Sequence, residues 1–201
     1  DLTPEQYSEL VPLLEQIRQR LFQLTDQVID ERTLLARTVD VGTIAQHAAE
    51  QFGLRGPMAR AAGLETDVRL DHPYAAYAKL SLHRVRQDGG DVYARLVVFL
   101  LEAYESIKLA EQAVRELPGG AWAGSIPAEV STGEASATVE SPHGRLSYTL
   151  QGDGLRLVSA TIDAPCQIDR LLARTLFVGA RLDNVLLIAL STDPAVAGAE
   201  L

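Results

Sequence analysis

The sequence of 201 residues contains a single cysteine, Cys166, which excludes an internal disulfide bond. One thiolate also excludes an iron–sulfur cluster or a cysteine-based zinc site built from this chain alone, because such sites take several thiolates. Long apolar runs are missing as well. A run such as Val185 to Leu190, which no other exceeds, falls far short of the ~20 residues that cross a bilayer. We therefore expect no membrane span and no thiolate-based metal centre.

Positive charge is scarce. Lys79 and Lys108 are the only lysines, and the formal net charge is −9. This balance argues against a nucleic-acid partner, because phosphate binding needs clustered Lys and Arg. The first ten residues, DLTPEQYSEL, are acidic and polar and do not read as a signal peptide. They lack an initiator Met, which suggests a fragment or a processed chain.

Two long helices dominate the pattern. Thr3-Pro4-Glu5 combines a capping hydroxyl, a proline at the first helical position and an acid in the first turn, and the apolar stripe that follows predicts a helix to Ile29. Asp91 is the expected cap of a second helix, Val92 to Leu117, ended by Pro118-Gly119-Gly120. Helices of this length predict an elongated bundle.

Shorter elements are expected between and after them. The patterns predict the following: a connector over Leu34–Val41, a helix over Ile44–Phe52 capped by Thr43, a brief strand over Leu80–Val85, and helices over Gln167–Phe177 and Val185–Leu190. The last of these is apolar almost all round, which is typical of a buried helix.

Apolar and polar residues alternate over Glu134–Glu140, Arg145–Gln151 and Leu155–Asp163, which predicts an antiparallel meander packed by one face on the helices. The fold class is α+β, a long-helix bundle with a small three-stranded antiparallel sheet. We expect a single domain over residues 1–201: a helical part (1–120), the meander (130–163), and C-terminal helices with a tail (164–201).

The stretch from Arg55 to Tyr77 concentrates glycine, proline and charges of both signs. It predicts an ordered loop held by arginine–carboxylate pairs; the alternative is a surface loop whose charges are solvated. Asp67 and Arg69 either form a structural ion pair or line a substrate or proton path. His72 could titrate near neutrality, but no second ligand stands at metal spacing from it.

The same stretch carries a resemblance. Its Gly-Pro, Arg, Ala-Gly, Asp-x-Arg and Pro-Tyr-x-x-Tyr, in that order, are similar to the large subunits of nickel–iron hydrogenases. The similarity is closer to the branch shared by membrane-bound (group 4) hydrogenases and the 49 kDa subunit of respiratory complex I. It extends from about Arg37 (RTVDVGTIAQ) through GDVYARLVVFLLEAYESI and SPHGRLSYTLQGDG to the last residue.

The departures from the family pattern concern the metal. The family's hydrogenases bind nickel and iron through two Cys-x-x-Cys pairs, the second after an Asp-Pro. Here Asp193-Pro194 is present, but Ala195 and Gly198 occupy the ligand positions, and the first pair would lie upstream of Asp1. Neither side chain has a donor atom. The resemblance therefore implies the complex I state, in which the former metal cavity is part of a quinone pocket.

The resemblance implies a subunit of an NAD(P)H-quinone oxidoreductase or hydrogenase-like complex that is not catalytic alone. This chain would form a cavity wall and a docking surface, binding no cofactor itself. Quinone and iron–sulfur clusters would belong to the partners, an iron–sulfur small subunit and membrane subunits, with the chain peripheral on the cytoplasmic face of the membrane. Candidate cavity residues are Arg60, Asp67, Arg69, His72, Asp193, Ala195 and Gly198.

Two alternatives accompany this hypothesis. One is a scaffold or interaction protein that keeps the fold without redox work; the other, a functional hydrogenase subunit, requires cysteines that the chain lacks. For the tail, we expect Asp193 to Gly198 to lie ordered against the first long helix and the loop around Arg60. Ala195 should be at least half buried, and Asp193 should accept hydrogen bonds from backbone amides or an arginine.

Overall fold

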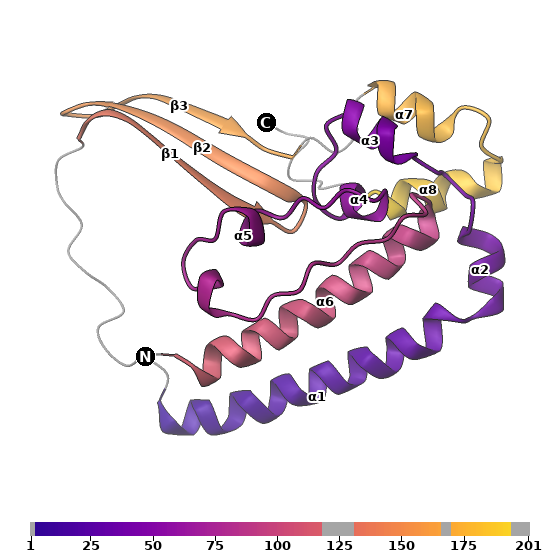
Figure 1. Cartoon of the computed structure of the whole chain (residues 1–201), viewed down its shortest axis with the longest axis horizontal. Coiled ribbons are helices and arrows are strands. Elements are labelled where there is room, and N and C mark those ends of the chain that lie inside the picture. The colour runs from indigo at the N-terminus through magenta and orange to yellow at the C-terminus, as the bar shows by residue number, and fades with distance from the viewer. Residues whose placement is uncertain (1–2, 118–130, 166–169, 194–201) are drawn as a thin grey trace.

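The structure, a computed structural model, describes residues 3–117, 131–165 and 170–193 (Figure 1). The helical elements are α1 (Pro4–Ile29), α2 (Arg32–Thr38), α3 (Gln46–Gln51), α4 (Gly56–Ala61), α5 (Val68–Asp71), η1 (Tyr77–Lys79), α6 (Val92–Arg115), α7 (Arg170–Phe177), η2 (Leu182–Asn184) and α8 (Val185–Ser191). The strands are β1 (Thr132–Ser141), β2 (Gly144–Asp153) and β3 (Leu157–Asp163). This arrangement confirms the predicted α+β fold of long helices and a small sheet.

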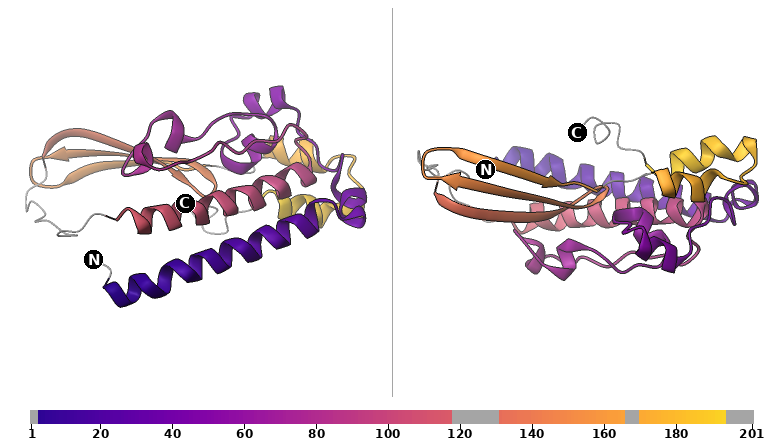
Figure 2. Two further views of the ribbon diagram at one scale, coloured as in Figure 1. Left: turned by 60° about the horizontal axis from the view of Figure 1, so that its bottom comes forward. Right: turned by 90° about the horizontal axis from the view of Figure 1, so that it is seen from above.

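The two long helices, α1 and α6, lie side by side and antiparallel (Figures 1 and 2). The predicted caps are confirmed: Thr3 Oγ1 accepts from the amide of Gln6, and Asp91 Oδ1 accepts from the amide of Ala94. Arg18, near the middle of α1, pairs with Glu111, close to the end of α6, at 3.1 Å. These caps and contacts fix the frame on which the shorter elements pack.

The apolar core lies at the end of the pair where α6 begins, and α3, α4, α7 and α8 meet there (Figure 2). Its buried members are Ile44, Ala49, Leu54, Met58, Ala59, Ala62, Val92, Leu172, Leu176 and Ile188. The core therefore sits beside α4, the short helix inside the stretch that the sequence predicted to be a loop.

The three strands form an antiparallel sheet in the order β1-β2-β3, as predicted. The expectation that one face packs on the helices is wrong. Contacts with α4 and α5 come from the end of the sheet that carries the β1–β2 turn, residues 141–144, which we call the hairpin end. Both faces of the sheet are largely exposed over the rest of its length. In Figures 1 and 2 the sheet extends from this end as an arm.

Two glycines let the hairpin turn, residues 141–144, approach α4 backbone to backbone. Gly56 has φ +62°, and a Cβ built on it would lie 2.3 Å from the carbonyl oxygen of His143. Gly144 has φ +121°, and its Cβ would lie 2.6 Å from the amide nitrogen of Gly56. Any side chain at either position would push the sheet away from α4.

Two short helices differ from their predictions. Residues 34–38 belong to α2 rather than to a connector, because the side chain of Glu31 caps the amide of Leu34 at 2.6 Å. Helix α3 starts two residues later than predicted, and Thr43 does not cap it. The amide of Ile44 instead donates to the carbonyl of Gly90 at 2.9 Å, which ties this segment to the turn before α6.

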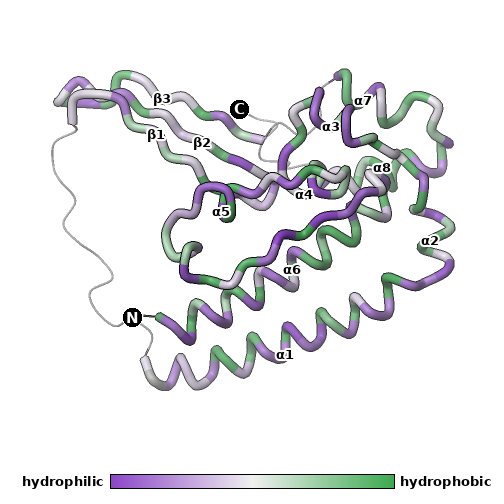
Figure 3. The backbone as a smooth tube through the Cα atoms, in the orientation of Figure 1, coloured by the Kyte–Doolittle hydropathy of each residue, from purple (hydrophilic) through white to green (hydrophobic). Residues whose placement is uncertain are grey.

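Three further expectations are corrected by tertiary contacts. The stretch from Arg55 to Tyr77 is ordered, but it contains α4 and α5. Residues 80–85 form no strand, because the amides of Ser81 and His83 donate to Gln112 and Glu105 of α6. Helix α8 buries only one face: Ile188 lies in the core, whereas Leu186 is 68% exposed. Figure 3 shows the apolar character of α8 that led to this prediction.

The close approach of α4 and the hairpin turn at Gly56 and Gly144, here called the glycine crossing, predicts different losses of stability for two substitutions. Gly53→Ala meets nothing within 4 Å, so it should cost only the ~1–2 kcal/mol of a left-handed conformation. Gly56→Ala has the same φ of +62° and also meets the backbone of His143, so it should destabilise the chain clearly more. Urea unfolding of the two variants measures the difference. Equal losses would show that the crossing is not tight.

Candidate functional site

Arg60 of α4 is 1% exposed and joins three elements. Its Nε donates to Glu102 of α6, and its Nη1 donates to Glu140 of β1 at 2.8 Å and to the carbonyl of Thr66 at 2.9 Å. Burial alone would lower the pKa of Arg60, but the two carboxylates outweigh it and raise that pKa. The guanidinium is therefore a permanent buried cation held between two acids.

Glu140 connects this cation to the arm. Its Oε2 accepts from the amide of Val68 at 3.1 Å, and its own amide donates to Tyr74 Oη at 3.1 Å. A second clamp lies nearby, where Asp163 of β3 binds Arg55 and Arg145, each at 2.9 Å. Arg55 is the main cause of the lowered pKa of Asp163, and Arg145 contributes less. The hairpin end is thus fixed by charge as well as by the glycine crossing.

Asp67 and Arg69 confirm the predicted ion pair. Both carboxylate oxygens of Asp67 are bound, Oδ1 by Arg69 Nε at 2.9 Å and Oδ2 by Arg69 Nη2 at 2.7 Å. These hydrogen bonds raise the pKa of Arg69. Asp71 caps the amide of Asp67 and pairs with Arg84 at 2.7 Å, while His72 is exposed. The stretch is held by arginine–carboxylate pairs, as the first of the two interpretations proposed.

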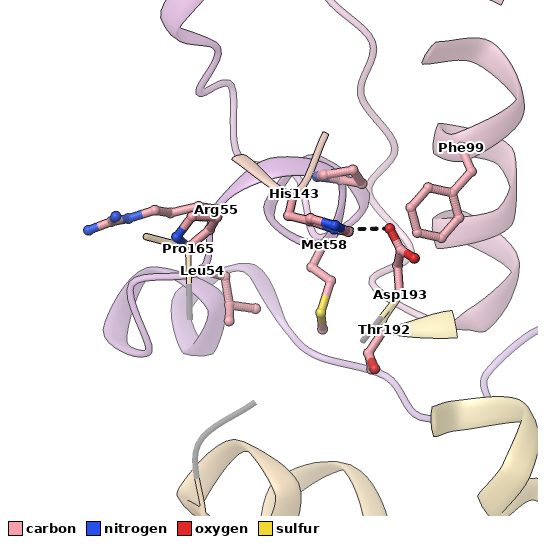
Figure 4. A pocket seen from close by; sticks show the side chains of 9 residues that line it. Leu54, Arg55, Met58, Phe99, His143, Pro165, Thr192 and Asp193 are labelled. Atoms are coloured by element: carbon pink, nitrogen blue, oxygen red, sulfur yellow. Dashed lines mark ion pairs between the residues drawn. The ribbon is translucent and has the colours of Figure 1, made fainter. Parts of the chain in front are cut away.

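Asp193 follows α8 with φ +48°, and its carboxylate faces His143 of the hairpin turn (Figure 4). Asp193 Oδ2 lies 3.1 Å from His143 Nδ1, at an angle outside that of a hydrogen bond, so the contact becomes an ion pair once the imidazole is protonated. The sequence predicted an arginine or backbone amides instead. Asp193 was also predicted to lie against α1, and this is wrong. Helix α1 packs on another face of α6, and the neighbours of Asp193 include Phe99 and Met58.

Arg95 fixes the segment that leads to Asp193. It is buried, and its guanidinium donates to Ser191 Oγ at 2.9 Å, to the carbonyl of Gly90 at 2.9 Å, and to the carbonyl of Gly42. Burial lowers the pKa of Arg95 to about 10. The arginine thereby links α6 to the last turn of α8, two residues before Asp193.

Two adjacent spaces surround the hairpin end. One, of about 300 Å³, is lined by Arg60, Arg69, Glu102, Glu140 and Asp193. The other, of about 600 Å³, is an open cleft lined by Arg55, Asp67, Asp71, His72, Glu140 and Arg145. Glu140 borders both. The predicted site residues therefore fall into two groups on either side of this carboxylate, and Ala195 and Gly198 lie outside the described residues.

Four residues of the site were not found from the sequence: Arg95, Glu102, Glu140 and His143. Glu102 carried a signal, because it interrupts an apolar stripe of α6 between Phe99 and Ala103 and a charge there calls for a buried partner. The other three act through contacts distant in sequence. In residues 3–117, 131–165 and 170–193, no three His, Cys, Asp or Glu side chains gather in a way that could hold a metal ion.

A family model described as the 49 Kd subunit of respiratory-chain NADH dehydrogenase matches residues 1–131, which is more than half of the chain. The chain belongs to this family. The resemblance carried by the Gly-Pro, Asp-x-Arg and Pro-Tyr-x-x-Tyr motifs is confirmed. Arg60, Asp67, Arg69 and His72 all lie inside the matched region of the 49 kDa family.

Relatives come from both branches of the resemblance. The carbon monoxide-induced hydrogenase of Rhodospirillum rubrum is 32% identical over 197 residues, covering 97% of this chain and 53% of that protein. A subunit of the NADH-quinone oxidoreductase of Dehalococcoides mccartyi is 27% identical over 196 residues, covering 96% of this chain and 53% of that protein. The chain thus spans about half the length of these curated relatives.

A solved structure supports the same fold. A chain of the membrane-bound sulfane sulfur reductase, an archaeal respiratory membrane complex, superposes with a TM-score of 0.87 at 25% identity. The match covers 96% of this chain and 54% of that chain. Among the helices that the structure describes here, none combines the length and the hydropathy of a membrane span.

Removing the buried cation should be costly. Arg60→Met leaves Glu102 and Glu140 uncompensated, so we expect a loss of ~3–5 kcal/mol in the free energy of unfolding, measured with urea. Arg86→Met removes an arginine whose two acidic partners, Glu65 and Asp88, are well exposed, and should cost less than about 1 kcal/mol. Similar losses in both variants would contradict the proposed weight of Arg60.

The clamp on Asp163 predicts a pH dependence. Because its pKa is lowered in the fold, its stabilisation is present above the ordinary carboxyl pKa of about 4 and is lost as the pH falls through the lower folded value. Near neutrality, the free energy of unfolding of the wild type should exceed that of Asp163→Asn by less than about 1 kcal/mol, since the carboxylate is half exposed. Urea titrations at decreasing pH should show the difference vanish; a difference that grows in acid would contradict the clamp.

Proposed function

We propose that the chain forms a cavity wall in a complex I-like or group 4 hydrogenase-like oxidoreductase and has no nickel–iron site of its own. The observation that carries this proposal is the position of Asp193 beside Arg60 and Arg69. It retains the family's Asp-Pro, and its carboxylate borders the same 300 Å³ space as Arg60 and Arg69. The residues that the family's hydrogenases use as ligands after that Asp-Pro are Ala195 and Gly198 here.

The donor set does not fit a nickel–iron centre. Such a centre needs four thiolates, and the chain has one cysteine, Cys166, at a position that the family does not use for metal. The wall instead contains the guanidinium groups of Arg60 and Arg69, which are hydrogen-bond donors, and the carboxylate of Asp193, which is an acceptor. A wall of this kind suits a small polar acceptor such as a quinone head group, which needs hydrogen-bond donors near its carbonyl oxygens.

The partners follow from the same proposal. The iron–sulfur clusters that deliver electrons would belong to a small subunit, and membrane subunits would anchor the assembly, so that this chain is peripheral on the cytoplasmic face. The names of the relatives, a hydrogenase and a component of an NADH-quinone oxidoreductase, support membership in an oxidoreductase of this class.

The first test is metal content. Elemental analysis of the purified chain should find no stoichiometric nickel, iron or zinc, because a single thiolate cannot hold the first two in a family-type centre. A chain carrying Cys166→Ser controls for adventitious metal at the one thiol. About one equivalent of nickel or iron that survives this substitution would refute the absence of a metal site.

The second test concerns the wall itself. In the intact complex reduced with dithionite, the rate at which decylubiquinone reoxidises the iron–sulfur clusters should fall several-fold with Asp193→Asn. The rate should be unchanged with Asp183→Asn, because Asp183 is exposed and pairs with Arg181 outside the cavity. Electron paramagnetic resonance follows the clusters directly. Equal rates in both variants, at equal subunit content, would show that Asp193 does not border an acceptor site and would favour the scaffold alternative.

A further inference from the structure

The arm has one apolar face and one polar face. The register pairs Ala137 with Tyr148 and Tyr148 with Ile162, so these three side chains project from the same side of the sheet. The residues on this apolar face are Ala135, Ala137, Val139, Leu146, Tyr148, Leu150, Ala160 and Ile162. The polar face carries Glu134, Ser136, Thr138, Glu140, Arg145, Ser147, Thr149, Gln151, Ser159, Thr161 and Asp163.

Side chains of the polar face bond to one another across the strands, and at the hairpin end Glu140 and Asp163 bond to Arg60 and Arg55. Ser136 and Thr149 bond across the strands at 2.8 Å, as do Thr138 and Ser147. The apolar face is partly exposed by contrast: Tyr148 is 43% exposed and Ile162 is 44% exposed. No charged residue interrupts it. A continuous, uncharged apolar surface of this kind is typical of the core of a protein interface.

The position of the arm leaves this face without cover from the helices. Contacts to α4 and α5 are made by the hairpin end, and the sheet extends away from them (Figure 2). A single layer of three strands needs packing on its apolar face for stability. The alternation of β1 and β2, continued in β3 from Ser159 to Asp163, therefore calls for an occupant that the helical part does not supply.

We propose that the apolar face of the arm docks an amphipathic helix of a second polypeptide in the complex. The proposal rests on the proposed membership in a multi-subunit assembly. Three strands are ~14 Å wide, and one helix of ~10–12 Å diameter covers that width. The small residues Ala135, Ala137 and Ala160 around Tyr148 leave room for large side chains of the incoming helix.

A second copy of the chain fits less well. The apolar face measures about 230 Å² in plane, since Ala135 to Val139 span five residues of ~3.3 Å along the strand and the three strands are ~14 Å across. Two copies that meet only there would bury well under the ~1,600 Å² of a standard interface. A larger partner that adds contacts at the rim of the sheet reaches that size.

The arm would also connect the docked partner to the cavity. Val139, on the apolar face, is followed at once by Glu140, whose carboxylate holds Arg60 and borders both spaces of the site. A helix bound across Val139 therefore restrains the strand that carries this carboxylate.

Adjacent residues of β1 give a matched experiment, because Ala137 lies on the apolar face and Thr138 on the polar face. A photo-crosslinking amino acid is placed at each position in the intact complex, and the crosslinked peptide is identified by mass spectrometry. We expect position 137 to crosslink to one partner peptide with helical apolar periodicity, and position 138 not to crosslink to it. Crosslinks from 137 only to a second copy, to a non-helical segment, to the same polypeptide, or to lipid would overturn the proposal.

Substitution gives a second readout. Ala137→Arg should reduce retention of the crosslinked partner in the purified complex at least tenfold, and Thr138→Arg should leave it unchanged, with circular dichroism confirming that both chains fold. Equal retention would contradict the docking face. This result can be distinguished from that of the cavity test. If the clusters are reoxidised at the normal rate in the Asp193→Asn complex, the cavity proposal fails, but the crosslink from position 137 to the partner is still expected.

Discussion

The buried guanidinium of Arg60 is the constraint on which the arrangement depends. A permanent cation at 1% exposure is costly unless its charge is compensated, and for Arg60 the compensating carboxylates come from Glu102 of α6 and Glu140 of β1. The first half of the chain supplies the cation and the long helix, and the second half supplies the strand. The sheet is therefore joined to the helices where the charge requires it, at the hairpin end.

The rest of the site follows from that attachment. Gly56 and Gly144 let the hairpin turn pass close enough for Glu140 to reach Arg60, and the turn then brings His143 within 3.1 Å of Asp193. Among the described residues, the sheet meets the helices at this end and extends from them with its apolar face exposed. Cavity and docking face are in this way two consequences of one attachment, which suits a subunit that works inside an assembly.

The sequence predicted those parts that local physics controls. Periodicity and caps located α1, α6 and the three strands, and charge pairing within a few residues located Asp67 and Arg69. It did not predict the buried helix α4, whose six residues owe their burial to tertiary packing. Nor did it predict Glu140 as a partner of Arg60, because a pair separated by 80 residues leaves no periodic trace. Alternation identified the apolar face of the sheet but not what covers it.

Amide hydrogen exchange of the wild-type chain tests the attachment most directly. The amide of Val68 donates to Glu140 Oε2, and the amide of Glu140 donates to Tyr74 Oη. Both amides should therefore exchange only when Glu140 separates from Arg60. The expected result is that both exchange as slowly as the buried first turns of α6, around Val97 and Val98. Exchange at the rate of exposed loops, with α6 still protected, would show that the hairpin end detaches freely and would contradict the account.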